Sequence, residues 1–198
     1  MTSGQIALLP GSGMTGIEAS IASIHQPGDR VLILNNGRFA SRLLQITQLY
    51  GLQPETLDVP WGDSIDPDAV ATALRSLDDC RGLWFVHSET STGVALDAQR
   101  IARLARESVP DLIIGMDAVT SLGVHEVRTD DWKLDVVATG MQKGLSAPPG
   151  MGILALSERA QERIARNERR TYTLDLKTVL ARQDQGQFTW TPPTSIVV

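Results

Sequence analysis

Short apolar runs alternate with longer amphipathic segments along this chain. The runs predict strands at residues 6–9, 31–34, 56–59, 83–86, 112–116, 136–139 and 152–156. Helices are expected between most of them: one covers residues 14–25 and ends at the turn sequence QPGD, and others begin at Asp66 and Asp97. Strands that alternate with helices are typical of a parallel sheet covered on both faces. We therefore expect an α/β/α sandwich with a mainly parallel seven-stranded sheet.

Composition narrows the classes of partner and compartment. The 198 residues are enough for one buried core, and 18 Lys and Arg against 23 Asp and Glu give a net charge of −5. That charge disfavours nucleic acid or an anionic membrane as the partner, and no run approaches the roughly 20 apolar residues that span a bilayer. Cys80 is the single cysteine, and the chain starts without a signal-peptide pattern. We expect a cytoplasmic protein that binds neither nucleic acid nor membrane.

The two ends of the chain predict a larger parent protein. The chain begins almost directly on a strand and ends in the apolar sequence PPTSIVV, without a closing helix or a polar tail. We expect residues 1–198 to be one domain cut from a longer chain.

A glycine-rich loop joins the first strand to the first helix. The sequence PGSGMTG at positions 10–16 places backbone N–H groups and a helix amino terminus around one point, which suits a phosphate. Gly11, Gly13 and Gly16 also fit the dinucleotide fingerprint GxGxxG. However, the second strand runs into Asn35 rather than into an acidic residue that could bind a ribose, which disfavours a dehydrogenase. A plain turn without a ligand remains an alternative for this loop alone.

A lysine and an aspartate follow two other buried strands. Lys143 comes after the strand at 136–139, and Asp117 directly follows the strand at 112–116. Considered alone, Lys143 could be a solvated surface lysine, and Asp117 could be a helix cap or a turn residue. Carboxyl ends of parallel strands meet at one edge, where such sheets bind ligands. A phosphate loop, a lysine amine that forms a Schiff base, and a carboxylate that keeps a pyridine nitrogen protonated are the three parts of a pyridoxal-phosphate site.

Five motifs in this order resemble those of class V aminotransferases, especially the alanine/serine–glyoxylate branch. They are GSG at 11–13, NGRF at 36–39, HSETSTGV at 87–94, DAVTSLG at 117–123 and QKGLSAPPG at 142–150. The resemblance implies the large domain of a fold-type-I, pyridoxal 5′-phosphate-dependent transferase, without the N-terminal arm and the C-terminal small domain of the family. In that family an arginine of the small domain binds the substrate carboxylate.

The resemblance also implies roles for individual residues. Those that touch the cofactor phosphate are Ser12, Gly13, Met14 and Gln142; those around the ring are Phe39 and Val119 on its two faces, Thr90 near its oxygen, Asp117 at its nitrogen and Lys143 at its aldehyde. Met14 and Phe39 depart from side chains that are common in the family, and Met14 still offers its backbone N–H. Simple core packing is the alternative for Phe39 and Val119.

Further residues are assigned by the same resemblance or by residue chemistry. The sequence FTWTPP at 188–193 resembles a segment that reaches into a neighbouring subunit, which implies a homodimer in which Thr191 contacts the partner's phosphate. Phe188 stands where the family has a tyrosine. His87 is expected to be a structural histidine, and Arg38 and Arg42 are expected to be solvated.

The implied activity is transfer of an amino group from a small amino acid, alanine or serine, to a 2-oxo acid such as glyoxylate or pyruvate. Two alternatives remain open. One is a pyridoxal-phosphate-dependent lyase on the same fold, because the cofactor supplies the same electron sink. The other is a cofactor-binding or assembly domain without turnover, since the substrate half of the site is not evident in this sequence.

Overall fold

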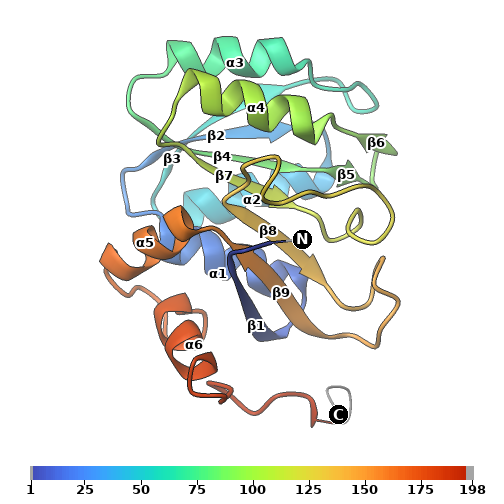
Figure 1. Cartoon of the computed structure of the whole chain (residues 1–198). Coiled ribbons are helices and arrows are strands. Elements are labelled where there is room, and N and C mark those ends of the chain that lie inside the picture. Colours follow the sequence, from blue (N-terminus) through green and yellow to red (C-terminus); the bar gives the residue numbers. More distant parts are fainter. Residues whose placement is uncertain (1, 195–198) are drawn as a thin grey trace.

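A computed structural model describes residues 2–194 of the chain as three layers (Figure 1). The sheet strands are β1 (Gln5–Gly11), β2 (Arg30–Asn35), β3 (Gln53–Asp58), β4 (Cys80–Val86), β7 (Ile113–Asp117), β8 (Val136–Gly140) and β9 (Gly150–Leu156), and a separate hairpin joins β5 (Ser88–Glu89) to β6 (Val94–Ala95). The helices are α1 (Gly13–Ile24), α2 (Arg38–Leu49), α3 (Pro67–Ser76), α4 (Ala98–Ser108), α5 (Glu158–Arg166) and α6 (Leu176–Gln183).

The strands form one seven-stranded sheet in the order β1-β9-β8-β7-β4-β2-β3. Only β9 runs against its neighbours, pairing antiparallel with β1 and β8, while the other neighbouring pairs are parallel. The predicted α/β fold with a mainly parallel seven-stranded sheet is therefore confirmed. A dinucleotide-binding fold has its first strand in the middle of the sheet. Here β1 is an edge strand, which agrees with the rejection of the dehydrogenase.

Helices cover both faces of the sheet and bury two hydrophobic cores. Strand β2 shows why: Val31 and Ile33 pack into the core beneath α1 and α2, whereas Leu32 and Leu34 pack into the core beneath α3 and α4. Successive side chains of a strand point to opposite faces, so a strand buried on both sides needs a continuous apolar run. None of the helices between residues 2 and 194 is long and apolar enough to cross a membrane.

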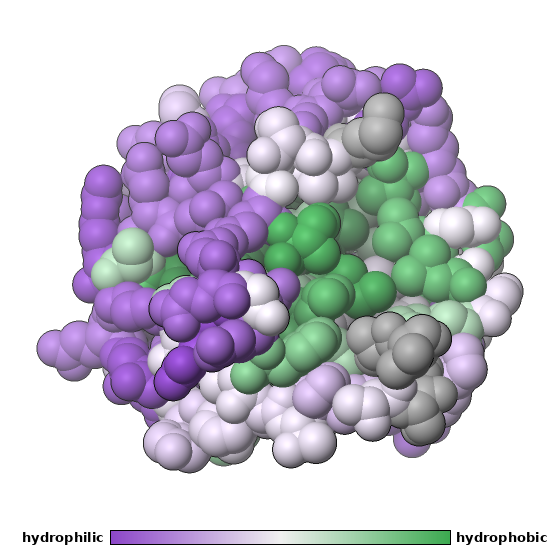
Figure 2. Space-filling model, turned by 60° about the horizontal axis from the view of Figure 1, so that its bottom comes forward, coloured by the Kyte–Doolittle hydropathy of each residue, from purple (hydrophilic) through white to green (hydrophobic). Residues whose placement is uncertain are grey.

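The edge strand β1 is protected along its backbone but keeps an apolar face. The side-chain amide of Gln183 accepts from the backbone N of Leu8 at 2.9 Å and donates to the carbonyl of Ile6 at 3.2 Å. These contacts occupy backbone groups that an edge strand otherwise leaves open to pairing. The side chain of Ile6 remains 41% exposed. Figure 2, which brings this lower side of the molecule forward, shows hydrophobic residues gathered in one continuous area.

Local details differ from the predictions: β3 and β4 each begin three residues earlier than expected, and one hairpin was not predicted. The third strand was expected at residues 56–59, but β3 spans Gln53–Asp58, because its first residues pair with Arg30 and Val31 of β2. As an edge strand, β3 leaves polar side chains in solvent, so its start carries no apolar signal. The β5–β6 hairpin was not predicted, because its strands have only two residues each.

Candidate functional site

A cavity of about 200 Å³ lies at the carboxyl edge of the parallel strands. Its walls come from the segments that follow β1, β4, β7 and β8, together with the start of α2. The lining residues are Ser12, Gly13, Met14, Phe39, Arg42, Val86, Ser88, Thr90, Asp117, Val119, Thr120, Gln142 and Lys143. Nine of the ten predicted cofactor residues are among them. The topology therefore collects residues spread over most of the sequence, while their roles toward a ligand remain predictions.

The glycine-rich loop forms one wall of this cavity. Strand β1 ends at Gly11, whose φ of 141° is rare for residues with a side chain, and α1 begins at Gly13. The backbone N of Ser12 donates to Oγ1 of Thr15 at 3.0 Å, which fixes the first turn of the helix. A Cβ atom on Gly13 would lie only 2.4 Å from Cγ2 of Val119. The helix amino terminus, with its partial positive charge, therefore approaches the loop after β7 closely.

Asp117 ends β7 and is almost completely buried, with 6% of its surface exposed. Its Oδ1 accepts from the backbone N of Val119 at 2.8 Å. Burial raises the pKa of Asp117 to about 6; the Val119 N–H opposes this rise, and the negative charge of Glu89 adds to it. A cation placed beside Asp117 would stabilise its charged form. The site of Asp117 therefore suits a ligand that places a positive charge beside this carboxylate.

Lys143 lies in the turn between β8 and β9. The turn is closed by hydrogen bonds from Ser146 N to Lys143 O at 2.9 Å and from Ala147 N to Met141 O at 3.0 Å. A Cβ atom on Gly144 would lie 2.2 Å from the carbonyl oxygen of Leu122. The turn that carries the lysine therefore packs directly against the loop that follows Asp117, and both side chains line one cavity.

Gln142 provides a polar atom without a partner. Its side-chain oxygen is buried and makes no hydrogen bond to any residue between 2 and 194, although the side chain lines the cavity. Buried polar atoms are nearly always paired in folded proteins. An amide can also turn its NH₂ group toward an acceptor such as phosphate. The unpaired oxygen is consistent with a ligand at this end of the cavity.

The expectation that Arg42 is solvated is wrong. Its guanidinium carbon lies 4.9 Å from the centroid of the Phe39 ring, and the half-buried side chain lines the cavity. Phe39 and Arg42 are three residues apart on α2, so their side chains meet on one helix face. This three-residue spacing from Phe39 was the feature of the sequence that could have predicted the position of Arg42. Arg38, in contrast, is exposed as expected.

Three other lining residues, Val86, Ser88 and Thr120, were not predicted from the sequence. Thr120 donates its hydroxyl to the carbonyl of Ser88 at 2.8 Å, which ties the loop after β7 to the β5 strand. Ser88 and Thr120 lie inside motifs that were recognised, and Val86 is the last residue of β4. Their proximity to strand ends was the signal that these residues belong to the site.

Two other predicted residues lie outside the cavity. His87 is buried against Trp132, with ring centroids 6.1 Å apart, and does not line the cavity. Burial, with a smaller effect of His125, lowers the pKa of His87 to about 4, so this histidine is neutral near pH 7. Thr191 is exposed and is not brought to the cavity of its own chain, and its contact with a partner remains a prediction. The apolar end at 196–198 lies outside the described residues.

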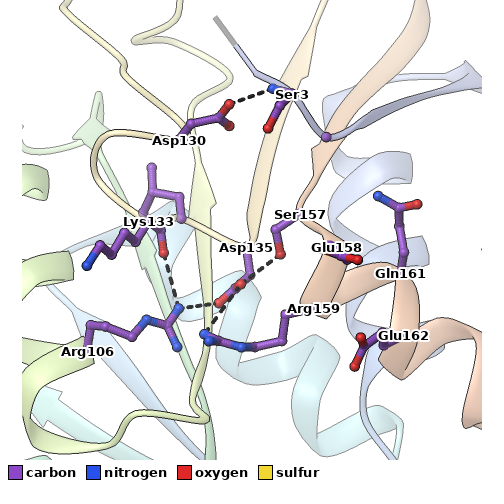
Figure 3. Close-up of a pocket in the computed structure, with 12 residues that line it drawn as sticks. Ser3, Arg106, Asp130, Lys133, Asp135, Ser157, Glu158, Arg159, Gln161 and Glu162 are labelled. Atoms are coloured by element: carbon purple, nitrogen blue, oxygen red, sulfur yellow. Dashed lines mark hydrogen bonds and ion pairs between the residues drawn. The ribbon is translucent and has the colours of Figure 1, made fainter.

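A larger cavity, of about 800 Å³, lies at the opposite edge of the sheet (Figure 3). Its centre is Asp135, whose carboxylate accepts from Arg106 at 2.6 Å, from Ser157 at 2.8 Å and from the backbone N of Ile114 at 2.9 Å. These contacts of Asp135 join α4, the start of β8 and the start of α5. We assign this hydrogen-bonded cluster to stability, whereas the smaller cavity gathers the residues that were predicted to bind the cofactor.

The three-layer fold is that of a fold-type-I transferase, and sequence comparison gives its family. The family described as aminotransferase class-V matches residues 4–193, so the chain belongs to the class V aminotransferases.

Individual relatives agree with this assignment. Aspartate aminotransferase of subgroup IV from Thermus thermophilus is 42% identical, with a TM-score of 0.91 over 99% of this chain and 54% of its own. Alanine–glyoxylate aminotransferase from Nostoc sp. is 31% identical, with a TM-score of 0.90 over 98% and 52%. The soluble hydrogenase 42 kDa subunit of Anabaena cylindrica is 37% identical over 100% of this chain and 52% of its own. The chain thus spans about half the length of these relatives.

Proposed function

We propose that this chain is the cofactor-binding half of a pyridoxal 5′-phosphate-dependent aminotransferase. The observation that carries the proposal is the convergence of the Ser12–Gly13 loop, Asp117 and Lys143 on one cavity at the carboxyl edge of the sheet. These groups are a phosphate-binding helix terminus, a buried carboxylate and an amine. No single one of them is specific, but pyridoxal phosphate needs all three.

The residues present fit this cofactor. Ser12, Gly13, Met14 and Gln142 would hold its phosphate, where Gln142 has an unpaired buried oxygen and any side chain on Gly13 would crowd Val119. Phe39 and Val119 would enclose its ring, and Thr90 would contact the ring oxygen. When bound, the cofactor supplies an electron sink for the substrate carbon.

The protein groups then have distinct tasks. Asp117 would hold a proton on the ring nitrogen, because the protonated nitrogen is the positive charge that would keep this buried carboxylate ionised. The Nζ atom of Lys143 would carry the cofactor covalently and, once released by the amino substrate, would move a proton from the α-carbon of the substrate to the cofactor carbon that had held the lysine.

The proposed substrates are a small amino acid, alanine or serine, and a 2-oxo acid such as glyoxylate or pyruvate. Support comes from the Nostoc relative, whose name includes alanine and glyoxylate, and from a Methylorubrum extorquens serine–glyoxylate aminotransferase that is 30% identical. The Thermus relative is named for aspartate, so product analysis should include aspartate as an amino donor.

The proposal is tested by spectroscopy and product analysis. The purified chain, mixed with pyridoxal phosphate, should develop a shifted cofactor absorbance that Lys143→Ala abolishes. Addition of excess alanine or serine should then convert the cofactor to its pyridoxamine form slowly, because the expected carboxylate-binding arginine belongs to the small domain. Losing a buried arginine–carboxylate contact costs roughly 2–5 kcal/mol. Rapid, saturable conversion at millimolar amino acid would show that this half suffices, and release of ammonia with an oxo acid would favour a lyase.

We also infer a homodimer in a cytoplasmic setting. The dimer is supported by the exposed Thr191, which lies outside its own cavity, and by the exposed apolar side chain of Ile6 on the edge strand β1. The compartment is supported by the single, buried, free Cys80. Sedimentation should report a dimer or larger, and Thr191→Ala should weaken cofactor binding. A stable monomer with full cofactor occupancy would contradict the shared site.

A further inference from the structure

Helix α2, which carries Phe39 and Arg42 into the cavity, begins without a capping side chain. Its N-cap residue is Gly37, which has no side chain to accept a hydrogen bond. Helices α3, α4, α5 and α6 are capped in the usual way by Asp66, Asp97, Ser157 and Asp175. The first amides of α2 therefore need an acceptor from elsewhere.

Glu89 supplies that acceptor from 50 residues further along the chain. Its Oε2 accepts from the backbone N of Phe39 at 2.9 Å and from the backbone N of Ala40 at 3.0 Å. The side chain of Glu89 is completely buried. A Cβ atom on Gly37 would lie 2.5 Å from Cγ of Glu89, so the missing side chain at Gly37 is what makes room for this carboxylate.

The other oxygen of Glu89 holds the turn that carries Thr90. Oε1 accepts from the backbone N of Ser91 at 3.1 Å and from its hydroxyl at 2.6 Å. The same hydroxyl oxygen accepts from the backbone N of Arg38 at 3.0 Å. A closed set of hydrogen bonds thus joins the start of α2 to the segment between β5 and β6.

Both carboxylate oxygens of Glu89 are thus occupied by four hydrogen bonds at the amino terminus of α2 and in the neighbouring turn, and no described residue forms an ion pair with Glu89. Glu89 also contributes to the raised pKa of Asp117. One buried carboxylate is therefore coupled to Phe39, Thr90 and Asp117, all of which line the cavity.

We propose that Glu89 is a positioning residue of the cofactor site, whose carboxylate replaces the missing cap of α2 and fixes Phe39 and Thr90 in one arrangement across the cavity. The inference rests on the proposed function, since that arrangement matters only for a ligand that lies between these residues. Glu89 itself does not line the cavity and acts through its neighbours.

The principal test compares Glu89→Gln with Asp97→Ala in the 198-residue chain. The amide keeps the size of Glu89, but its NH₂ group would face N–H donors, so one half of the network is lost. Asp97→Ala removes a helix cap from α4, on the other face of the sheet. We expect Glu89→Gln to weaken binding of pyridoxal phosphate about tenfold or more, since hydrogen bonds to a charged group are strong. Asp97→Ala should lower the melting temperature and leave cofactor affinity unchanged.

Two measurements without cofactor separate positioning from general stability. Amide hydrogen exchange at Phe39 and Ala40 should be about tenfold faster in Glu89→Gln and unchanged in Asp97→Ala. The pKa of Asp117, followed by NMR of its carboxyl carbon, should fall in Glu89→Gln because a nearby negative charge is removed. Glu89→Asp, which keeps the charge on a shorter side chain, should recover part of both effects.

Each outcome decides one claim. If the wild-type chain binds no pyridoxal phosphate, the proposed function fails and the positioning role fails with it, which is visible without any variant. If the wild type binds the cofactor and Glu89→Gln binds it equally well, only the Glu89 inference is overturned. If Glu89→Gln does not fold, Ser91→Ala takes its place: it removes one hydroxyl from the network and should weaken cofactor binding about threefold, and unchanged affinity would overturn the inference.

Discussion

Gly13 and Val119 lie so close together that a Cβ atom on Gly13 would be only 2.4 Å from Cγ2 of Val119. Gly13 is the first residue of α1, just after β1, and Val119 belongs to the loop after β7, more than one hundred residues later. The proposed phosphate end and the proposed ring face of the site are therefore in direct contact.

This contact predicts that Gly13→Ala damages the site and that a second change repairs it. The added methyl group should push the two loops apart and weaken binding of pyridoxal phosphate, because overpacking typically costs 1–3 kcal/mol. Val119→Ala removes the opposing methyl groups, so the double variant should bind better than Gly13→Ala alone. Isothermal titration of all four proteins gives the coupling energy. Additive losses in the double variant would mean that the two residues act independently.

Lys143 is predicted to be the residue that carries the cofactor. Borohydride reduction of the chain loaded with pyridoxal phosphate should leave a stable pyridoxyl group on the peptide that contains Lys143. The other two lysines, Lys133 and Lys177, serve as internal controls because neither lines the cavity. Peptide mapping by mass spectrometry reads the result. A label on either control lysine, or on none, would refute the assignment.

Asp117 should make the stability of the cofactor-free chain depend on pH. Its pKa rises from 3.8 to about 6 on folding, which corresponds to about 3 kcal/mol. Folded protein holds this proton more tightly than unfolded protein, so stability from this group is lost as the pH rises from about 4 to about 6. Asp117→Asn should therefore match the wild type near pH 3.5 and exceed it by up to about 3 kcal/mol at pH 8.

Urea unfolding across this pH range measures the difference between Asp117→Asn and the wild type, and an Asp→Asn change at the exposed Asp111 is the control. A difference that stays flat between pH 4 and pH 6 would show that Asp117 is not buried as described. With cofactor bound, the same variant should keep the ligand but lose turnover, since an amide cannot hold a proton on the ring nitrogen.

Asp135 should matter for stability and leave the cofactor cavity unaffected. Asp135→Ala leaves the buried Arg106 guanidinium and the N–H of Ile114 without their acceptor, and breaking a buried pair in this way costs about 3–5 kcal/mol. Glu162→Ala is the matched control, because Glu162 lines the same cavity but pairs with Arg166 in solvent, where such pairs contribute at most about 1 kcal/mol. Chemical denaturation measures the free energy of unfolding of both variants. Loss of cofactor affinity in a folded Asp135→Ala variant would contradict the separation of the two edges.

The sequence determined the elements of this protein and the chemistry of its reactive groups. Apolar runs set the strands because a strand buried on both faces must be apolar throughout, as β2 is. Glycines marked the loop after β1, and the positions of Asp117 and Lys143 after buried strands placed them at one edge, since parallel strands end together. These signals are local, so they are readable along the chain.

Only the tertiary structure decided which residues meet. The position of β1 at the sheet edge, the approach of Gly13 to Val119, and the entry of Arg42 into the cavity depend on strand order and on packing between distant segments. Glu89 shows the reason most clearly. Its carboxylate and the uncapped start of α2 are 50 residues apart in sequence, and neither residue type nor spacing indicates that they pair. Contacts of this kind form only when distant segments pack together, because each polar group that is buried then needs a hydrogen-bond partner among the residues that the fold places beside it.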